Sequence, residues 1–328
     1  MRLRLVPQET SFDFFKYARV TFGASIVAVI ASLVIWLSVG LNFGIDFLGG
    51  TTIRTDSTVQ VEVAEYRAAL EPLGLGDVVI SEVFDPNFAA DQHVVTVRIQ
   101  AQEGAEAVTP EIILAIETAL LEAVDPAMTF PSVESVGPKV SGELIQTAII
   151  AVLASLGAIL VYIWLRFEWQ FSVGAVAALI HDIILTIGVF SLFQIRFDLA
   201  TIAALLTIVG YSINDTVVIF DRLRENLIKY KQKALRDVMN LSANETLSRT
   251  LMTSGTTLIA LIALIVLGGD VIRGFVFAIA WGVVVGTYSS IYVAKNVVLM
   301  IGVKRDWSKP TDGGAGGPGG TQFANVDA

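Results

Sequence analysis

Residues 144–165 read LIQTAIIAVLASLGAILVYIWL, a run of twenty-two residues without a charged side chain. A helix of about 20 apolar residues is long enough to cross roughly 30 Å of hydrocarbon. Five further stretches of similar length and mostly apolar composition lie at residues 20–39, 169–193, 199–220, 251–267 and 275–301. The sequence therefore predicts an all-α membrane bundle of six spanning helices.

The overall composition agrees with this class. Of 328 residues, 54% are hydrophobic and 16% are charged, whereas soluble domains carry about 25% charged residues. The stretch 20–39 follows several basic residues and so resembles a signal peptide. Its apolar run is longer than the about 7–15 residues of such a peptide, and residues 42–50 offer no small-residue cleavage site. We expect an uncleaved first span.

Residues 41–143 differ in composition from the rest of the chain, with 17 acidic and 4 basic residues. Apolar alternation and turn residues predict strands at 51–55, 78–84, 93–100 and 128–136 and helices at 60–70 and 110–124. The second helix is expected to begin with Thr109 as its N-cap and Pro110 at its first position. The order β-α-β-β-α-β indicates an inserted α+β domain of the ferredoxin-like split type.

Basic residues in the short loops predict the orientation. Residues 221–250 carry seven Lys or Arg, whereas the short loops on the opposite side hold only Arg196 and Arg273. Both termini are therefore expected in the cytoplasm and the α+β domain outside it. The predicted organisation is 1–40 (N-terminus and first span), 41–143 (exported domain), 144–302 (five spans with the cytoplasmic loop 221–250) and 303–328 (flexible glycine-rich tail).

The loop 221–250 allows two interpretations. Its leucines alternate with basic residues, which is typical of a helix lying on the anionic inner leaflet. A solvated connector fits equally well.

Charge inside the predicted spans is the main candidate for function, because no hydrolase, kinase, redox or nucleotide-binding motif is present. The chain has no cysteine and two histidines. We expect no metal site, no cofactor, no nucleic-acid partner and no enzyme activity. Asp215 lies deep in the fourth span, where a carboxylate costs about 2.5–3.5 kcal/mol. It is either a proton site, with Asn214 beside it, or a hydrogen-bonded packing residue.

Three other polar residues of the spans leave alternatives open. His181 and Asp182 lie midway along the third span and form either a proton relay or a packing contact with a neighbouring helix. Arg249 either pairs with an intramembrane carboxylate or extends its charge to the inner surface. Lys295 is predicted to reach the inner leaflet in the same way.

Two glycine motifs have predicted structural roles. Gly282 and Gly286 form a GxxxG packing face, directed to this chain or to a second one. The segment after the first span is expected to act as a hinge, with glycines for tight backbone geometry and an aspartate that binds turn amides: Gly44, Asp46, Gly49 and Gly50.

Several longer motifs resemble the SecD/SecF family of the RND superfamily over residues 40–302. The segment 44–51 reads GIDFLGGT, residues 136–138 read VGP and residues 248–250 read SRT. The most specific motif is GYSINDTVVIFDR at residues 210–222, and GTYSSI follows at 286–291. Lys295 and Asn296 depart from the more apolar, proline-containing sequence of the family at this position.

This resemblance implies a subunit of the bacterial Sec export machinery in the inner membrane. It would be one RND-like half that pairs with SecD, with SecYEG, YajC, membrane lipid and an unfolded preprotein as further partners. Proton flow would drive its cycle, and Asp215 and Arg249 match family positions implicated in that flow. Asp182 matches a recurrent position. An RND-type exporter of lipids or small molecules and a passive translocon scaffold are the alternatives.

Overall fold

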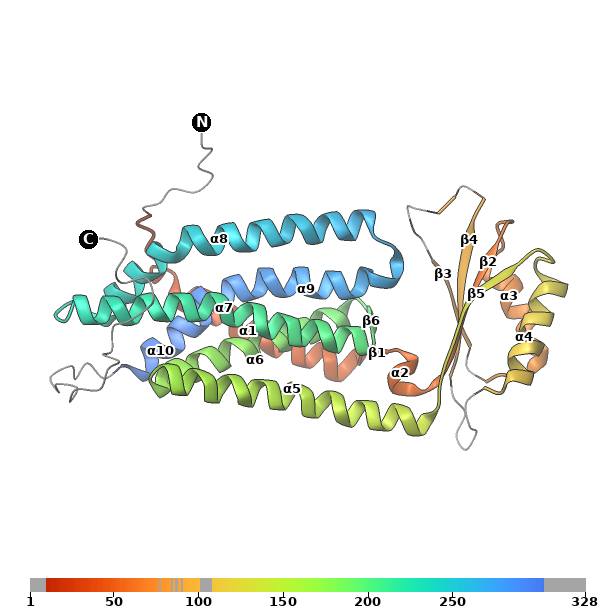
Figure 1. Ribbon diagram of the computed structural model, residues 1–328, viewed down its shortest axis with the longest axis horizontal. Coiled ribbons are helices and arrows are strands. Elements are labelled where there is room, and N and C mark those ends of the chain that lie inside the picture. Colours follow the sequence, from red (N-terminus) through yellow and green to blue (C-terminus); the bar gives the residue numbers. More distant parts are fainter. Residues whose placement is uncertain are drawn as a thin grey trace, which may run out of the picture.

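Six long helices run side by side, and a small α+β domain lies at one end of them (Figure 1). The computed structural model describes residues 10–76, 78–83, 85, 88, 89, 91–100 and 108–303. Within these residues, six helices are long and apolar enough to cross a membrane, as the sequence predicts. They are α1 (Ala18–Val39), α5 (Pro138–Arg166), α6 (Trp169–Leu192), α7 (Leu199–Lys229), α8 (Leu235–Leu267) and α9 (Asp270–Ser289), which continues through the π-helical turn η2 (Ser290–Ala294) into α10 (Lys295–Ile301).

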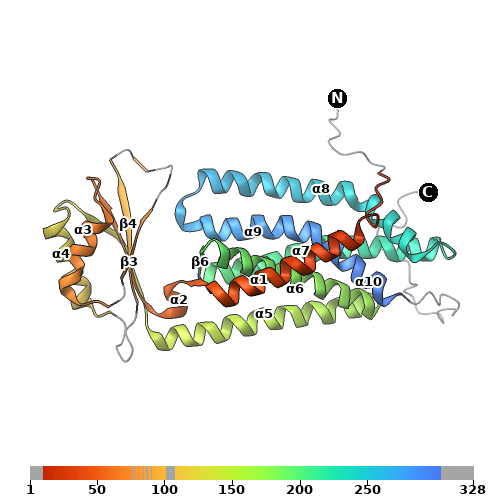
Figure 2. The ribbon, with the colours of Figure 1, turned by 180° about the vertical axis from the view of Figure 1, so that it is seen from behind.

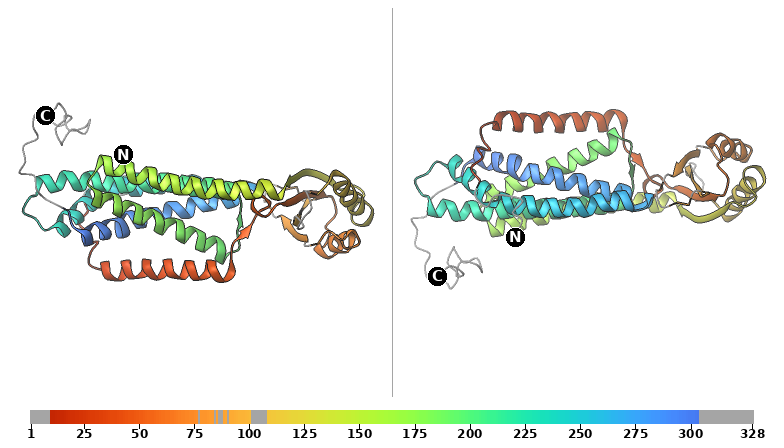
Figure 3. Two further views of the ribbon diagram at one scale, coloured as in Figure 1. Left: turned by 90° about the horizontal axis from the view of Figure 1, so that it is seen from below. Right: turned by 90° about the horizontal axis from the view of Figure 1, so that it is seen from above.

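The helices α6, α7 and α9 form the centre of the bundle, while α1, α5 and α8 lie around it. In the most apolar window of each central helix 44–56% of the residues are buried, against 11% in each outer helix. Figure 3 shows α1 at one edge, beside α6. The outer helices therefore offer most of their apolar surface to lipid or to another protein.

Glycines allow the central helices to approach one another closely. The missing Cβ of Gly282 would collide with the side chain of Ile208, and that of Gly286 would lie 3.0 Å from Ser212 Cβ. The GxxxG face of α9 therefore packs against α7 of the same chain. Gly188 of α6 lies in the same way against Ser32 of α1.

The region 221–250 is neither of the two structures predicted for it. Helix α7 continues to Lys229 and α8 begins at Leu235, so only a short turn joins them. The interleaved leucines are not a membrane-facing stripe, because Leu223 and Leu227 are buried against Val238 of α8 in the main core. Arg222 Nε lies 2.7 Å from Glu245 Oε2 and further joins the two helices.

The segment before α1 folds back over this end of the bundle. Its backbone binds α8, since the Phe12 amide donates to Asn244 Oδ1 at 2.8 Å and the Phe14 amide to Asn240 Oδ1 at 2.9 Å. The prediction for Lys295 is wrong, because its side chain is buried and its Nζ lies 4.7 Å and 4.3 Å from the ring centroids of Phe14 and Phe15. These rings enclose the ammonium group and stabilise it by cation–π contact.

The inserted domain has the predicted order of elements. Its strands are β2 (Gly50–Ser57), β3 (Val78–Val83), β4 (His93–Gln100) and β5 (Thr129–Val136), and its helices are α3 (Val63–Leu70), the 3-10 turn η1 (Glu71–Leu73) and α4 (Pro110–Ala123). The sheet order is β3-β4-β2-β5, and all neighbours are antiparallel. Thr109 is the N-cap residue of α4, although its side chain makes no capping hydrogen bond.

The two helices of the domain cover one face of its sheet. Ile53 and Val97 are paired across β2 and β4 and are buried against Tyr66 of α3 and Ile116 of α4. Figures 1 and 2 show α3 and α4 on the side of the sheet away from the bundle, so the other face is turned towards the membrane helices.

Two connections join the domain to the bundle. On entry, β1 (Asn42–Phe43) pairs in parallel with β6 (Arg196–Phe197), and the short helix α2 (Ile45–Leu48) follows. On exit, Gly137 alone separates β5 from α5. Phe43 and Phe197 pack edge to face with ring centroids 5.9 Å apart, which gives the junction an aromatic core.

Replacing Gly282 with valine is expected to destabilise the bundle by about 1–3 kcal/mol, because the new side chain would overpack the contact with Ile208. The change is measured as the loss of folded protein on heating in detergent. Gly157→Val on α5 is the control, since nothing lies within 4 Å of the missing Cβ there. Equal stability of the two variants would contradict the close α7–α9 contact.

Asp125 stabilises the α+β domain through its buried carboxylate. Oδ2 accepts a hydrogen bond from Ser57 Oγ at 2.6 Å, and Oδ1 accepts one from the Ala127 amide at 2.8 Å. The Ser57 hydroxyl, with the Ala127 amide, lowers the pKa of Asp125 below its ordinary value. The stabilisation is therefore complete above the unfolded pKa, near 3.9, and is lost as the pH falls through the lower folded pKa.

Asp125→Asn is expected to lower the stability of the domain by about 1–3 kcal/mol near neutral pH and to weaken its acid-side pH dependence. Hydrogen exchange of β2 and β5 in the full-length chain measures both effects. Glu122→Gln, at an exposed carboxylate of α4, is the control. Protection that is equal in Asp125→Asn and the native chain would rule out this role.

Candidate functional site

A layer of polar side chains crosses the apolar bundle at mid-height. We use the term polar layer for its six residues, which come from the helices α6 to α9: Asp182, Ser212, Asp215, Ser254, Thr287 and Ser289. All but Thr287 are nearly inaccessible to solvent. Because charge and unsatisfied polarity are costly in hydrocarbon, the hydrogen bonds within this layer determine how the four helices fit together.

Asp182 of α6 is hydrogen-bonded to the two other central helices, α7 and α9. Its Oδ2 accepts hydrogen bonds from Ser212 Oγ of α7 at 2.7 Å and from Ser289 Oγ of α9 at 2.8 Å. Its Oδ1 lies 2.9 Å from Nδ1 of the adjacent His181. The structure therefore places Asp182 in contact with neighbouring helices, one of the two predicted arrangements, and gives it His181 as a third partner.

His181 extends this site towards α1. Its ring stacks on Tyr288 with centroids 6.2 Å apart, and Tyr288 donates a hydrogen bond to the Thr21 carbonyl at 2.9 Å. Ser25 Oγ also lies 2.9 Å from the Tyr288 hydroxyl. Among the described atoms, His181 Nε2 is buried without a hydrogen-bond partner. One nitrogen of the imidazole thus contacts a carboxylate, while the other makes no hydrogen bond to the described residues.

Asp215 lies one turn after Ser212 on the same face of α7 and is also buried. Its Oδ2 accepts from Ser254 Oγ of α8 over a long distance of 3.5 Å. Ser254 in turn lies 2.7 Å from Thr287 Oγ1 of α9. Compared with Asp182, Asp215 is held by a weaker contact to its hydroxyl neighbour, because hydrogen bonds weaken towards this distance.

The other two predicted residues lie at the edge of the layer, beside Asp215. Both are exposed, but the Asn214 side chain and the charge of Arg249 each interact with the Asp215 carboxylate. Among the ion pairs of the described part of the chain, none joins Arg249 to Asp215. Tyr211 of α7 donates a hydrogen bond to Thr257 Oγ1 of α8 at 3.2 Å.

Sequence reasoning named the two carboxylates of the layer but missed the roles of its hydroxyl partners. Ser212 and Ser289 are small polar residues within the polar motifs at 210–216 and 286–291, and such residues are common in spanning helices without any special role. The usable signal is spacing, since Ser212 precedes Asp215 by one helical turn. Which carboxylate each hydroxyl contacts depends on the crossing of separate helices.

The segment predicted as a hinge forms the entry to the α+β domain. Asp46 Oδ2 accepts from the Leu199 amide at 3.0 Å, at the first turn of α7, instead of binding its own turn. Gly49 and Gly50 have φ values of 73° and 127°, which favour glycine. A Cβ on Gly44 would lie 3.2 Å from Arg196 Nε.

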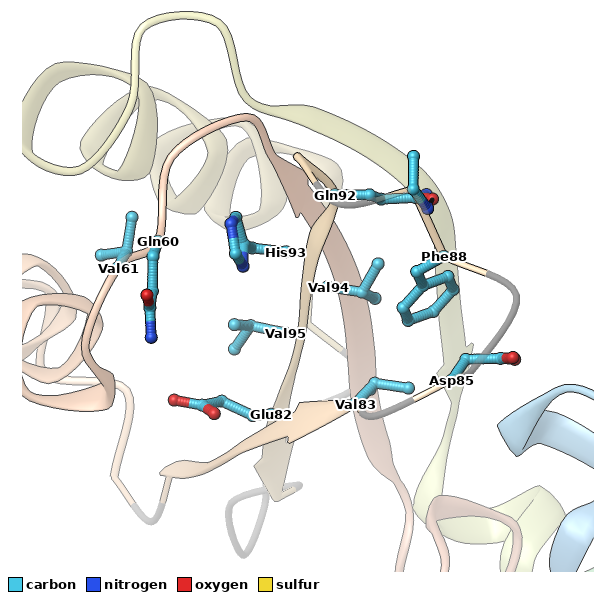
Figure 4. Close-up of a pocket in the computed structure, with 11 residues that line it drawn as sticks. Gln60, Val61, Glu82, Val83, Asp85, Phe88, Gln92, His93, Val94 and Val95 are labelled. Carbon is cyan, nitrogen blue, oxygen red and sulfur yellow. Dashed lines mark hydrogen bonds between the residues drawn. The ribbon is translucent and has the colours of Figure 1, made fainter.

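The α+β domain also has a concave surface. A pocket of about 420 Å³ lies beside β3 and β4 (Figure 4). In Figure 4, His93, Val95 and Glu82 lie on one side of β4, and Val94 and Phe88 lie on the other. Among the described residues, no three His, Cys, Asp or Glu side chains converge as metal ligands would.

Comparison with known proteins identifies a family and several relatives that the chain resembles. Residues 116–304 match the family described as "Protein export membrane protein SecD/SecF, C-terminal", and residues 34–61 match the "SecD/SecF GG Motif". The chain is 67% identical to the protein translocase subunit SecF of Cereibacter sphaeroides over 327 residues, covering 100% of this chain and 99% of the relative. It is 42% identical to that of Vibrio alginolyticus, covering 94% and 95%.

Solved structures show the same fold. SecDF from Thermus thermophilus, described as a translocon-associated membrane protein, superposes with a TM-score of 0.81 at 37% identity over 92% of this chain. SecDF in a super-membrane-facing form gives 0.65 at 39% identity over the same share. This chain spans 40% of the length of each of those SecDF chains. With more than half of its residues in the family match and such relatives, the chain is a multi-pass membrane protein of the SecD/SecF family.

Proposed function

We propose that the chain is a subunit of the Sec machinery that, together with SecD, uses the proton-motive force to promote late steps of preprotein translocation through SecYEG. The names of its relatives support the export role. The observation that carries the coupling to protons is the polar layer, in which two carboxylates are buried at the centre of an apolar bundle. Burying a carboxylate in hydrocarbon costs free energy, and carboxylates that are kept there usually have a function.

Within this proposal Asp215 is the proton site and Asp182 positions the helices around it. Asp182 already contacts three side chains at 2.7–2.9 Å, so its environment is fixed. Asp215 has the longer contact of 3.5 Å with Ser254, and a change of protonation there would alter the α7–α8 contact. His181 would pass or buffer the proton beside Asp182.

Arg249 and Asn214 take part from the exposed side of the layer. Arg249 lies on α8 about one and a half turns before Ser254, so a modest shift of α8 along α7 would bring its charge closer to Asp215. Asn214 is exposed beside Asp215, where the second six-helix half, SecD, would pack. The single bundle described here would then be completed by its partner.

The energy available from protons is sufficient for such movements. One elementary charge that crosses 100 mV gains about 2.3 kcal/mol. A few protons per cycle would therefore shift a two-state equilibrium of the α+β domain by several kcal/mol, enough to change which state predominates. The segment with Gly44, Asp46, Gly49 and Gly50 would act as the hinge.

The α+β domain is proposed to be ferredoxin-like and exported, with both termini in the cytoplasm and the bundle in the bacterial inner membrane. Its strand β3 lies at one edge of the sheet, with Ser81 and Glu82 exposed. An edge strand can bind an extended polypeptide by strand addition. The pocket beside β3 and β4 offers both apolar and polar side chains to such a segment. YajC and membrane lipid complete the set of proposed partners.

Asp215→Asn tests the coupling because it keeps the side-chain shape and removes the titrating group. In vesicles energised after ATP-driven initiation, we expect loss of the proton-motive-force contribution to late translocation, with assembly intact. Asp221→Asn is the matched control on the same helix, where the carboxylate is half-exposed and paired with Arg166 at 3.1 Å. Unchanged export by Asp215→Asn would favour the passive scaffold, and accumulation of a lipid in place of a preprotein would favour the exporter.

A single-cysteine experiment tests the contact with the preprotein, since the native chain contains no cysteine. Ser81→Cys on the edge strand β3 is expected to crosslink to a translocating chain arrested in SecYEG. Glu65→Cys on the exposed side of α3 should crosslink several-fold less, because the helices cover the opposite face of the sheet. Equal labelling at both positions would argue against strand addition at β3.

A further inference from the structure

A pocket of about 320 Å³ lies where the open face of the sheet meets the end of the bundle, and we call it the junction pocket. Arg98 and Gln100 of β4 and Val79 of β3 line it from the domain. Asn42 and Leu48 of the entry segment line it from the other side, together with Gln194 between α6 and α7. Because α1 ends at Val39 and α6 at Leu192, the pocket lies at the level where the spanning helices end.

One guanidinium group lines this pocket and a second lies beside it, and both have few partners. Arg98 Nη1 donates to Asn42 Oδ1 at a long 3.5 Å, and Arg98 Nε is buried without a hydrogen-bond partner among the described residues. Beside the pocket, Arg196 Nε is likewise without a hydrogen bond in the described part of the chain, and it lies 3.8 Å from Asp198 Oδ2. Buried donors that lack a partner indicate that a ligand or ordered water satisfies them.

The carboxylates near the two guanidinium groups also accept hydrogen bonds from other groups. Asp198 is shared, since its Oδ1 caps α7 by accepting from the Thr201 amide and hydroxyl, each at 3.0 Å. The carboxylate of Asp46 accepts from the Leu199 amide. Burial lowers the pKa of Arg98, and the positive charge of Arg196 lowers it further, while the carboxylate of Asp198 raises it. An anion bound near the two guanidinium groups would favour the charged form of Arg98 in the same way as Asp198 does.

The chemistry of the walls defines the kind of anion. Leu48 and Val79 are 43% and 50% exposed, and both contribute to the pocket lining. Guanidinium groups bind phosphate oxygens through their planar fork of N–H donors. Apolar walls beside these donors, at the end of the spanning helices, suit a molecule with both an acyl chain and a phosphate. We propose that the junction pocket binds the phosphodiester headgroup of an outer-leaflet phospholipid, held by Arg98 and Arg196 beneath the α+β domain.

Native mass spectrometry of the full-length chain in detergent tests this site. The probes are dioleoylphosphatidylglycerol, dioleoylglycerol, which lacks the phosphate, and inorganic phosphate. We expect one phosphatidylglycerol to be retained by the native chain and to be held about tenfold more weakly by Arg98→Gln, because charge-assisted hydrogen bonds are lost. Arg67→Gln, an equal change of charge on the exposed side of α3, should retain it like the native chain.

Three results would overturn the proposal. They are equal retention of phosphatidylglycerol by Arg98→Gln and the native chain, equal retention of dioleoylglycerol, and binding of inorganic phosphate with no retained lipid. If Arg98→Gln does not fold, Arg98→Lys decides, since it keeps the charge but lacks the fork. This variant should hold the lipid several-fold more weakly than the native chain, and full retention would exclude recognition by Arg98.

Discussion

The fold depends on the hydrogen bonds of two carboxylates that are buried in a mostly apolar bundle. Helices in a membrane gain little from the hydrophobic effect when they associate, because lipid tails are as apolar as leucine. Close packing and internal hydrogen bonds must therefore determine their arrangement. Asp182 meets this need by accepting from Ser212 and Ser289 on two other helices, and the glycines of α9 allow the necessary approach. The residues of the polar layer thus both hold the helices together and carry the proposed proton chemistry.

The sequence predicted the six spans and the order of elements in the inserted domain, because apolar length and strand alternation are local properties. It failed where one element covers another. The leucines of 221–250 were assigned to a membrane surface or to solvent, although Leu223 and Leu227 face Val238 across a helical hairpin. Lys295 was assigned to the inner leaflet, because nothing in its own helix shows that Phe14 and Phe15 fold back over it.

The candidate site shows the same limit. Asp215 and Asp182 stand out in the sequence, since a carboxylate in an apolar run is conspicuous. Their different surroundings are not visible there, because Ser212, Ser254 and Ser289 come from three helices whose relative heights depend on packing. The structure separates a tightly held carboxylate from a loosely held one. It places Arg249 at the edge of the layer, where, within the described part of the chain, its charge interacts with Asp215 without a direct ion pair.

The two tethers of the inserted domain are unequal. Gly50 and Val136, at the two ends of the domain, are paired across β2 and β5, so the tethers leave the sheet side by side. The incoming one is a ten-residue segment with a short helix and positive-φ glycines, whereas the outgoing one is Gly137 alone. A torque on the sheet would therefore reach α5 through a single residue and α1 only through the ten-residue segment. A force on the domain would then tilt the outer helix α5 and, through it, change the helix arrangement inside the membrane.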